Sequence, residues 1–286
     1  EKNGTMSEIV YLNGEFLPRS EALISPDDRG FIFGDGIYEV IKYYNGTPFC
    51  FEEHMDRLRR SLKEISIEYP ETAMFKNIFS RLLSVNNFMN VHAGLYLQIT
   101  RGVNPRVHYF PERIIPTVYV FTFPLPSFTE SLEKGIKVIT HSDIRWLRCD
   151  IKSTALLPNT MLFNQAVEQG AGECILIRDG LVTEATHSSV FGVKEGKVIT
   201  HPLSPLILPG ITRQVVLEIC SRNAIPYEER TVLADELFHL DELFITGTGS
   251  EVTPVVEVDG KKVGAGQKKP GEITRFLQSK FFEMVP

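Results

Sequence analysis

Lys152 and Glu184, 32 positions apart, are the two residues of this chain whose types could most readily carry out chemistry together. Lys152 lies in an arginine-rich stretch, and a lysine amine that is buried or close to other cations loses its proton more readily. The neutral amine attacks aldehydes to form a Schiff base. A carboxylate such as Glu184 can hold a pyridine nitrogen protonated, so that the ring withdraws electrons. The pair suggests an enzyme that uses pyridoxal 5′-phosphate (PLP), although a single lysine is usually a solvated surface residue.

Two glycine-containing turns could bind the phosphate of such a cofactor. Residues 208–213, with the sequence LPGITR, lead into a predicted helix whose first amides are unpaired and lie at the positive end of the helix dipole. Residues 246–251, TGTGSE, follow a predicted strand, and their small side chains let backbone and hydroxyl groups approach an anion. Each turn by itself is also explained as an ordinary helix start or a turn between strands.

Three further features could bind a charged substrate or cofactor. Residues 101–111, RGVNPRVHYFP, form a predicted loop whose arginines and histidine look like a carboxylate trap, because the planar guanidinium matches a carboxylate. Tyr38 lies on a predicted strand and shares a face with Val40 and Lys42. Arg57 lies near the apolar stripe of a predicted helix. The alternatives are a solvated loop, a packed tyrosine and a solvated arginine.

The elements that must position these residues include antiparallel hairpins in both halves of the chain. Asn-Gly or Asp-Gly pairs, which favour tight hairpin turns, occur at positions 13–14, 45–46, 179–180 and 259–260. We predict that 9–12 pairs with 15–17, 38–44 with 47–51, and 174–178 with 181–184. Further predicted strands are 94–100, 117–123, 136–141, 190–193, 197–200 and 243–246.

Helices alternate with these strands without a strict β-α-β rhythm. In residues 52–65 an apolar side chain recurs every three to four positions, which predicts an amphipathic helix. Other predicted helices are 71–85, 160–169, 211–222 and 271–284. The fold class is therefore α+β with antiparallel or mixed sheets. Two prolines and two serines in 123–131 favour a linker there, so we expect a small N-terminal α/β domain (1–125), a linker (126–131) and a large C-terminal PLP-binding domain (132–286).

The composition excludes several classes of protein. The chain has 286 residues, 43% of them hydrophobic, and a net charge of −6, which argues against a protein that coats nucleic acid or an anionic membrane. No apolar run approaches the ~18 residues of a membrane helix, and no secretory signal pattern occurs, so we expect a cytoplasmic protein. The four cysteines form no C-x-x-C pair and the seven histidines no metal-binding spacing, so we expect neither a disulfide scaffold nor a metal site.

The order of the motifs resembles the fold-type IV family of PLP-dependent aminotransferases. The motifs are FGDGxYE, EHxDRL, RGxxPRxH, DIK, TEATxSSVF, PGITR and TGTxSExTP, and the similarity runs from about residue 9 to 284. Within the family, the chain is most similar to the bacterial D-amino acid aminotransferase branch. The R-x-H pair separates this branch from L-branched-chain aminotransferases and aminodeoxychorismate lyase.

This resemblance implies a role for each matching residue. Lys152 matches the Schiff-base lysine that also moves the proton between the substrate Cα and the cofactor, and Glu184 matches the partner of the pyridine nitrogen. The other matches are the phosphate ligands Arg57, Ile211, Thr212 and Thr248, the apolar residue under the ring, Leu208, and the substrate carboxylate trap, Tyr38, Arg106 and His108. The family is homodimeric, with Arg106 and His108 reaching the neighbouring subunit's site and the active site between the two domains.

The implied function is a D-amino acid:2-oxo acid aminotransferase with a ping-pong PLP/pyridoxamine phosphate mechanism, for example D-alanine and 2-oxoglutarate to pyruvate and D-glutamate. An L-branched-chain or (R)-amine aminotransferase and aminodeoxychorismate lyase remain alternatives, as does a non-catalytic binding protein with the same fold. The chain departs from the family pattern at five positions near the expected cofactor site: Thr186, His187, Ser189, Gly247 and Gly249. The affinity for the cofactor and the reactivity of the bound cofactor could therefore differ from those of the family.

Overall fold

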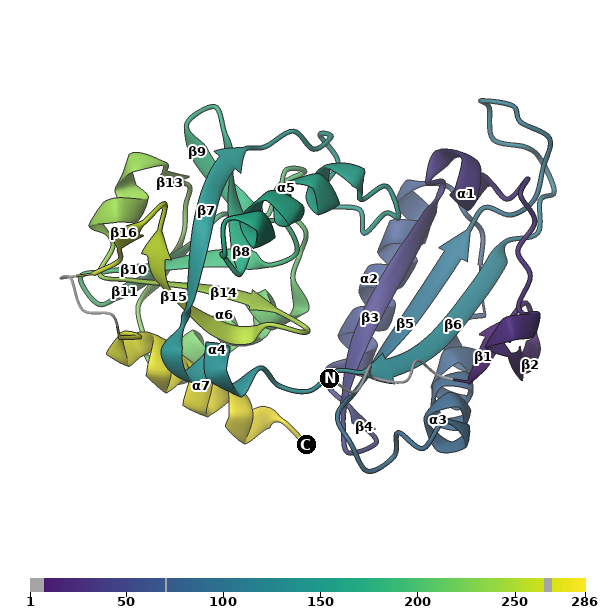
Figure 1. Ribbon diagram of the computed structural model, residues 1–286, viewed down its shortest axis with the longest axis horizontal. Coiled ribbons are helices and arrows are strands. Elements are labelled where there is room, and N and C mark those ends of the chain that lie inside the picture. The colour runs from purple at the N-terminus through teal and green to yellow at the C-terminus, as the bar shows by residue number, and fades with distance from the viewer. Residues whose placement is uncertain (1–7, 70, 265–268) are drawn as a thin grey trace. The chain divides into compact units, whose positions relative to one another are not determined.

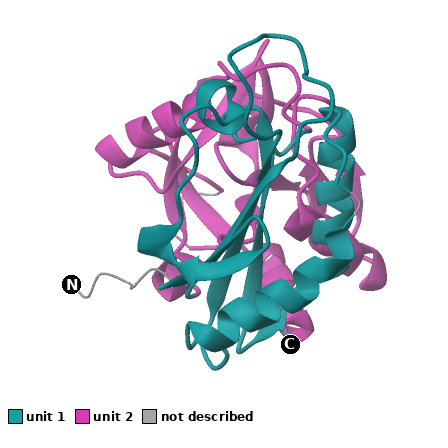
Figure 2. Cartoon of the chain, turned by 90° about the vertical axis from the view of Figure 1, so that its right-hand side faces the viewer, with its two compact units in different colours: residues 1–126, 151–155, 286 teal, residues 127–150, 156–285 magenta. Residues whose placement is uncertain are grey.

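Two units, each with its own core, make up the computed structural model, which describes residues 8–69, 71–264 and 269–286. The described residues within 1–126, 151–155 and 286 form the N-terminal unit, and those within 127–150 and 156–285 form the C-terminal unit (Figure 2). We expected everything after residue 131 to lie in the second domain. The segment 151–155 differs from this expectation because Ile151 is buried in the core of the N-terminal unit.

The N-terminal unit is built on an antiparallel sheet with the strand order β2-β1-β6-β5-β3-β4 among the described residues (Figure 1). Its strands are β1 (Ile9–Leu12), β2 (Glu15–Pro18), β3 (Gly36–Tyr44), β4 (Thr47–Pro48), β5 (Ala93–Thr100) and β6 (Thr117–Pro124). Its helices are η1 (Arg19–Glu21), α1 (Arg29–Phe33), α2 (Phe51–Glu64), η2 (Thr72–Met74) and α3 (Phe75–Val85).

Helix α2 packs on β3 through the apolar stripe that its sequence predicts. Met55, Leu58 and Leu62 are buried in the core of this unit. The predicted helix at 71–85 is confirmed only from Phe75, because residues 72–74 form the 3-10 turn η2. Helix α1 was not predicted: Asp28 caps it by accepting a hydrogen bond from the Gly30 amide at 2.7 Å.

The C-terminal unit contains a larger mixed sheet with the order β12-β11-β10-β14-β15-β7-β8-β9-β13, and β16 pairs with β15. Its strands are β7 (Ile136–Ser142), β8 (Glu173–Arg178), β9 (Leu181–Ala185), β10 (Ser189–Lys194), β11 (Lys197–Thr200), β12 (Tyr227–Glu229), β13 (Val232–Leu233), β14 (Glu242–Gly247), β15 (Glu251–Val258) and β16 (Lys261–Lys262). Its helices are α4 (Thr129–Lys134), α5 (Leu157–Glu168), α6 (Ile211–Arg222), η3 (Asp235–His239) and α7 (Glu272–Met284).

Helices cover this sheet at several places. Helices α6 and α7 pack against each other and against β14, and α7 also packs against β15 (Figure 1). Helix α5 packs on β8, where Leu162 and Ala166 are buried against Cys174 and Leu176. None of the described helices is long and apolar enough to cross a membrane.

The predicted hairpins are confirmed at β1–β2 and β8–β9. The predicted turn at 259–260 joins β15 to β16, although neither of these strands was predicted. At β3–β4 the pairing is shorter than predicted, because only Thr47 and Pro48 pair with β3 and Phe51 already begins α2. The predicted α+β class with antiparallel and mixed sheets is confirmed, since β7 runs parallel to both β8 and β15 while most other pairs are antiparallel.

Candidate active site

Lys152 is held beside the start of β3 in the N-terminal unit. Its carbonyl oxygen accepts a hydrogen bond from the Tyr38 amide at 3.0 Å, and the next residue, Ser153, forms an antiparallel bridge with Ile37. Lys152 Nζ lies 4.3 Å from the centroid of the Tyr38 ring. Among the described residues of this unit, no carboxylate forms an ion pair with Lys152. The backbone of Lys152 is therefore tied to β3, and its amine lies against the Tyr38 ring.

Arg57 belongs to a buried cluster with Glu39 and His54. Arg57 Nε donates to Glu39 Oε1 at 2.7 Å and Nη2 donates to Oε2 at 2.8 Å, while His54 Nδ1 lies 2.8 Å from Oε2. Burial raises the pKa of the Glu39 carboxyl, but the charge and hydrogen bonds of Arg57 and His54 outweigh burial and lower it to about 2. Burial lowers the pKa of His54. Glu39 is therefore a carboxylate that fixes Arg57.

We did not assign Glu39 or His54 from the sequence, although both lie within the FGDGxYE and EHxDRL motifs. The periodicities of the strand and of the helix could have indicated where these two side chains lie. Glu39 alternates with Tyr38 along β3 and so points to the opposite face. His54 and Arg57 are three positions apart on α2 and share one side of the helix.

Arg106 and His108, which the sequence places in the carboxylate trap, meet at Phe33. The Arg106 guanidinium carbon lies 5.3 Å from the centroid of the Phe33 ring, and the His108 ring lies 5.6 Å from it. Tyr38 is half-buried and stacks on Tyr96, with 5.6 Å between ring centroids. The structure thus brings Arg106 together with His108, and Tyr38 together with Lys152.

Glu184 lies on β9 in the C-terminal unit, where both oxygens of its buried carboxylate accept hydrogen bonds. Arg145 Nη1 donates to Oε1, and the Leu208 amide donates to Oε2 at 3.1 Å. Burial raises the pKa of the Glu184 carboxyl above its usual value, against the opposing effect of Arg145. Because burial destabilises the charged carboxylate, a further cation beside it, such as a protonated ring nitrogen, would be stabilised.

Arg145 was not predicted, and it joins Glu184 to Asp143. Its Nε and Nη2 each donate to an oxygen of Asp143 at 2.9 Å. Burial alone would lower the pKa of Arg145, but the two carboxylates raise it. Asp143 and Arg145 are two positions apart, so the local D-x-R pattern could have predicted their contact. Arg145 and Glu184 are 39 positions apart, and no local pattern relates them.

The first phosphate turn lies directly beside Glu184, through the Leu208 amide. Helix α6 begins at Ile211 with Gly210 as its N-cap and with no side-chain cap. The amides of Ile211 and Thr212 therefore lie at a helix start, where no intrahelical acceptor exists. A Cβ atom at Gly210 would lie 2.7 Å from Ser189 Oγ, so only glycine lets this hydroxyl approach.

The second phosphate turn, residues 246–251, spans the end of β14 and the beginning of β15 and contains the half-buried Thr248. Ser250 Oγ lies 3.2 Å from Ser188 Oγ, which follows Glu184 by four residues. The structure thus places this turn beside the end of β9 and the beginning of β10. Glu184 and both phosphate turns belong to one connected group in the C-terminal unit.

His187, one of the departures from the family pattern, pairs with the buried Glu173. His187 Nδ1 lies 2.9 Å from Glu173 Oε2, and the Thr186 hydroxyl and the Cys174 amide donate to Oε1. Burial raises the pKa of Glu173, but His187 and these hydrogen bonds outweigh burial and lower it. His187 is therefore a partner of the buried Glu173 through Nδ1.

The chemistry of these groups fits PLP. The helix-start amides and hydroxyls of the two turns suit a phosphate, and Gly210 keeps Ser189 close to the helix start. The buried carboxylate of Glu184 suits a basic ring nitrogen, and the amine of Lys152 suits an aldehyde. Among the described residues, no group of three His, Cys, Asp or Glu side chains is placed to hold a metal ion.

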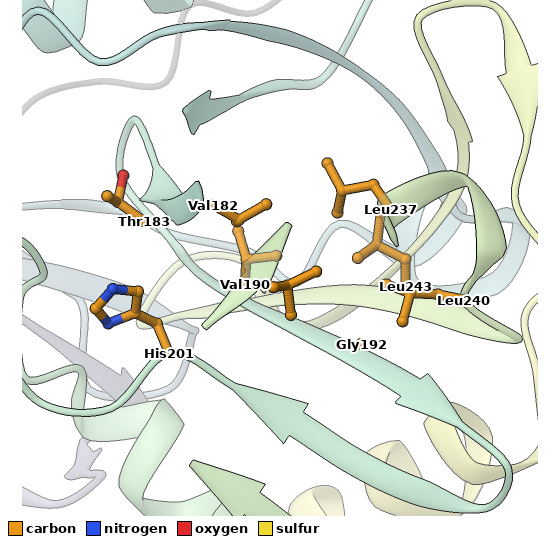
Figure 3. Close-up of a pocket in the computed structure, with 9 residues that line it drawn as sticks. Val182, Thr183, Val190, Gly192, His201, Leu237, Leu240 and Leu243 are labelled. Carbon is orange, nitrogen blue, oxygen red and sulfur yellow. The ribbon is translucent and has the colours of Figure 1, made fainter. Parts of the chain in front are cut away.

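A separate pocket lies in the core of the C-terminal unit and contains none of the predicted site residues (Figure 3). Its lining is mostly aliphatic, and Thr183 and His201 contribute the polar side-chain atoms. Burial lowers the pKa of His201, and the Thr183 hydroxyl already donates to Asp143 at 3.1 Å. We therefore interpret it as a packing gap between strands and η3.

Comparison with known proteins identifies the family. The family model described as amino-transferase class IV matches residues 36–258. A D-alanine aminotransferase of Bacillus licheniformis is 45% identical over 271 residues, which cover 94% of each chain. A D-alanine aminotransferase of Staphylococcus haemolyticus is 44% identical over 278 residues, 96% of this chain and 97% of that protein.

Solved structures agree with this result. The branched-chain amino acid aminotransferase of Escherichia coli superposes with a TM-score of 0.91 at 26% identity, covering 98% of this chain and 95% of that one. Because a family model spans most of the chain and relatives match it almost end to end, this protein belongs to the amino-transferase class IV family.

Proposed function

We propose that this chain is a D-amino acid:2-oxo acid aminotransferase that uses PLP. The cofactor assignment rests on Glu184, the Leu208 amide and the start of α6, which form one connected group. This group offers a buried carboxylate next to a helix end that suits a phosphate. The D-alanine aminotransferases that match this chain at 44–45% identity support the choice of substrate. D-Alanine with 2-oxoglutarate is the substrate pair we expect.

Lys152 and Glu184 would carry the central roles. PLP, when bound, supplies an electron sink that makes the substrate Cα–H bond acidic. Lys152 would hold the cofactor through its amine and, once released, move the proton at the substrate Cα. Glu184 would hold a proton at the ring nitrogen, with Arg145 keeping its carboxylate in place.

The remaining residues would bind the phosphate and the ring. Ile211 and Thr212 offer amides and a hydroxyl at the start of α6, and Thr248 lies in the second turn. Arg57 would add a positive charge, oriented by its two hydrogen bonds to Glu39. Leu208 would pack under the ring.

Tyr38, Arg106 and His108 would bind the substrate carboxylate. The guanidinium, the imidazole and the phenol can each donate a hydrogen bond to an anion, and Arg106 offers the planar fork that pairs with both carboxylate oxygens. Fixing the carboxylate on one side of the cofactor would present the Cα–H bond of a single enantiomer to Lys152. This is the physical reason to expect selection of one enantiomer, and the matching D-alanine aminotransferases favour D over L.

We further propose that the enzyme is a homodimer in which Arg106 and His108 complete the neighbouring subunit's site. Large apolar side chains on the N-terminal unit support an interface there, since Leu23, Phe31 and Ile115 are 83%, 78% and 85% exposed. Light scattering should show a dimer, and Ile115→Asp should weaken it.

A cytoplasmic location is part of the same proposal. The four cysteines are free thiols in the structure, and three of them are buried. Reduced thiols are typical of proteins in a reducing compartment.

The cofactor assignment is tested by absorption and labelling. The purified protein with PLP should be yellow, and borohydride should attach the cofactor irreversibly to Lys152, as peptide mass spectrometry would show. Lys152→Ala should abolish both the label and turnover, whereas Lys137→Ala, at an exposed lysine, should retain both. A protein that takes up no PLP would leave only a binding role.

The stereochemical assignment needs an enantiomer-resolved donor screen. The comparison is D-alanine against L-leucine with 2-oxoglutarate as acceptor, because the Escherichia coli structure named above is a branched-chain aminotransferase. Turnover of L-leucine alone would show that the L-branched-chain alternative is correct. Turnover of D-alanine that depends on Arg106 would support the proposed function.

A further inference from the structure

Arg29 is a buried arginine beside the carboxylate trap, and we assigned it no role from the sequence. It begins α1 and is 3% exposed. Its Nε donates to Asp35 Oδ2 at 2.7 Å, and its Nη1 donates to the carbonyl oxygen of Val107 at 2.6 Å. We propose that Arg29 is a positioning residue that holds Val107 in place and thereby positions Arg106 and His108.

The bond from Arg29 is the only hydrogen bond made by residues 106–108 to any residue that the structure describes. The side chains of Arg106 and His108 are exposed, so burial does not fix them either. Val107 lies between the two in the chain. A single hydrogen bond to its carbonyl oxygen therefore restrains the backbone that carries both trap residues.

Phe33 adds a second restraint on the same residues. It follows Arg29 by four positions on α1, and the Arg29 guanidinium carbon lies 4.7 Å from the centroid of its ring. Arg106 and His108 contact this ring as well, at 5.3 Å and 5.6 Å. Cation–π and ring contacts of this kind orient side chains without burying them. Arg29 and Phe33 together form a platform for the trap.

Asp35, which accepts the hydrogen bond from Arg29, is itself held in place by a second arginine, Arg101. Arg101 donates to both of its oxygens, from Nε at 2.8 Å and from Nη2 at 3.0 Å. Arg101 also donates to the carbonyl oxygens of Ile65 and Ser66. Because Asp35 keeps this partner when Arg29 is replaced, variants at Arg29 leave no unpaired carboxylate and should fold.

An arginine is required at this position because two acceptors lie on different edges of its guanidinium. The single nitrogen of a lysine cannot reach both Asp35 and the Val107 carbonyl in this geometry. The inference rests on the proposed function, in which Arg106 and His108 bind the substrate carboxylate. A displaced trap should therefore weaken binding of carboxylate-bearing substrates and leave the proton transfer by Lys152 intact.

The test compares Arg29→Lys and Phe33→Leu with the wild-type holoenzyme. Arg59→Lys, at a half-exposed arginine of α2 whose partners are Asp56 and Thr72, is the control. For Arg29→Lys we expect the KM of D-alanine to rise about tenfold, the loss typical of one charged hydrogen bond, with kcat within about twofold. Hydrogen–deuterium exchange in residues 103–113 should become faster.

Each alternative result has a defined meaning. An unchanged KM in Arg29→Lys, or unchanged exchange in residues 103–113, would overturn the positioning role. A fall in kcat as large as the rise in KM would also overturn it, because it would indicate general damage to the fold. If the wild-type holoenzyme does not turn over D-alanine, the proposed function is wrong, and the exchange experiment with the KM of L-leucine then decides the role of Arg29.

Discussion

Glu39→Gln should cost the protein several kcal/mol of unfolding free energy, and the cost should depend on pH. Glu39 is 1% exposed and is the acceptor for Arg57, with His54 at hydrogen-bond distance. A glutamine presents one oxygen and turns its NH2 group toward a donor. Arg57 would then lose the carboxylate that neutralises its charge, and breaking a buried ion pair costs about 3–5 kcal/mol.

The pH dependence follows from the low pKa of Glu39. Its pKa is about 2 in the folded protein, against an ordinary value of 4.5. A lowered pKa means that the charged form stabilises the native state above pH 4.5 and that this stability is lost as the pH falls toward 2. The difference, 4.5 − 2, corresponds to about 3 kcal/mol at ~1.4 kcal/mol per pH unit.

Urea unfolding followed by circular dichroism would measure this, at fixed protein and PLP concentrations because both shift stability. The difference between wild type and Glu39→Gln should be at least 3 kcal/mol at pH 6.5 and about 1.4 kcal/mol smaller at pH 3.5. Glu53→Gln, at an exposed glutamate of α2, should change stability by less than about 1 kcal/mol. A difference that is the same at both pH values would refute the reasoning.

Three further substitutions test other parts of the structure. Arg145→Leu should raise the pKa of Glu184 further and lower the unfolding free energy by about 3 kcal/mol or more, with weaker PLP binding measured by absorption titration; unchanged PLP affinity would argue against this role of Arg145. His187→Ala should destabilise the protein by about 1–3 kcal/mol, because Glu173 loses its imidazole partner; a double-mutant cycle with Glu173→Gln should show coupling, and additive effects would contradict the pairing. Gly102→Ala should lower the melting temperature, since its φ is +111° and a Cβ would lie 2.0 Å from a backbone carbonyl oxygen; an unchanged melting temperature would contradict that geometry.

Local sequence patterns determined much of the secondary structure. The Asp-Gly turn at 179–180 closes the β8–β9 hairpin because both residues adopt positive φ, which is a property of the dipeptide. Helix α6 has the predicted bounds, Ile211–Arg222, because Pro-Gly precedes an amphipathic stretch. Strand β15 was missed, since it contains Pro254, and pairing with β14 and β7 overrides the local preference against proline in a strand.

The types of the central residues were also readable from the sequence, but their partners were not. Lys152 and Glu184 stood out by chemistry and motif, and the matching relatives support the same family. Only the folded structure shows that Glu39 fixes Arg57, that Arg145 holds Glu184, and that residues 151–155 pack with the N-terminal unit.

The physical reason is the reach of local rules. Helix and strand periodicities relate residues two to four positions apart, whereas Arg145 and Glu184 are 39 positions apart and Arg29 and Val107 are 78 apart. These long-range contacts depend on the fold, which buries charged groups and thereby makes it costly to leave them unpaired. The sequence therefore determined which groups the protein carries, and the tertiary structure decided which of them act together.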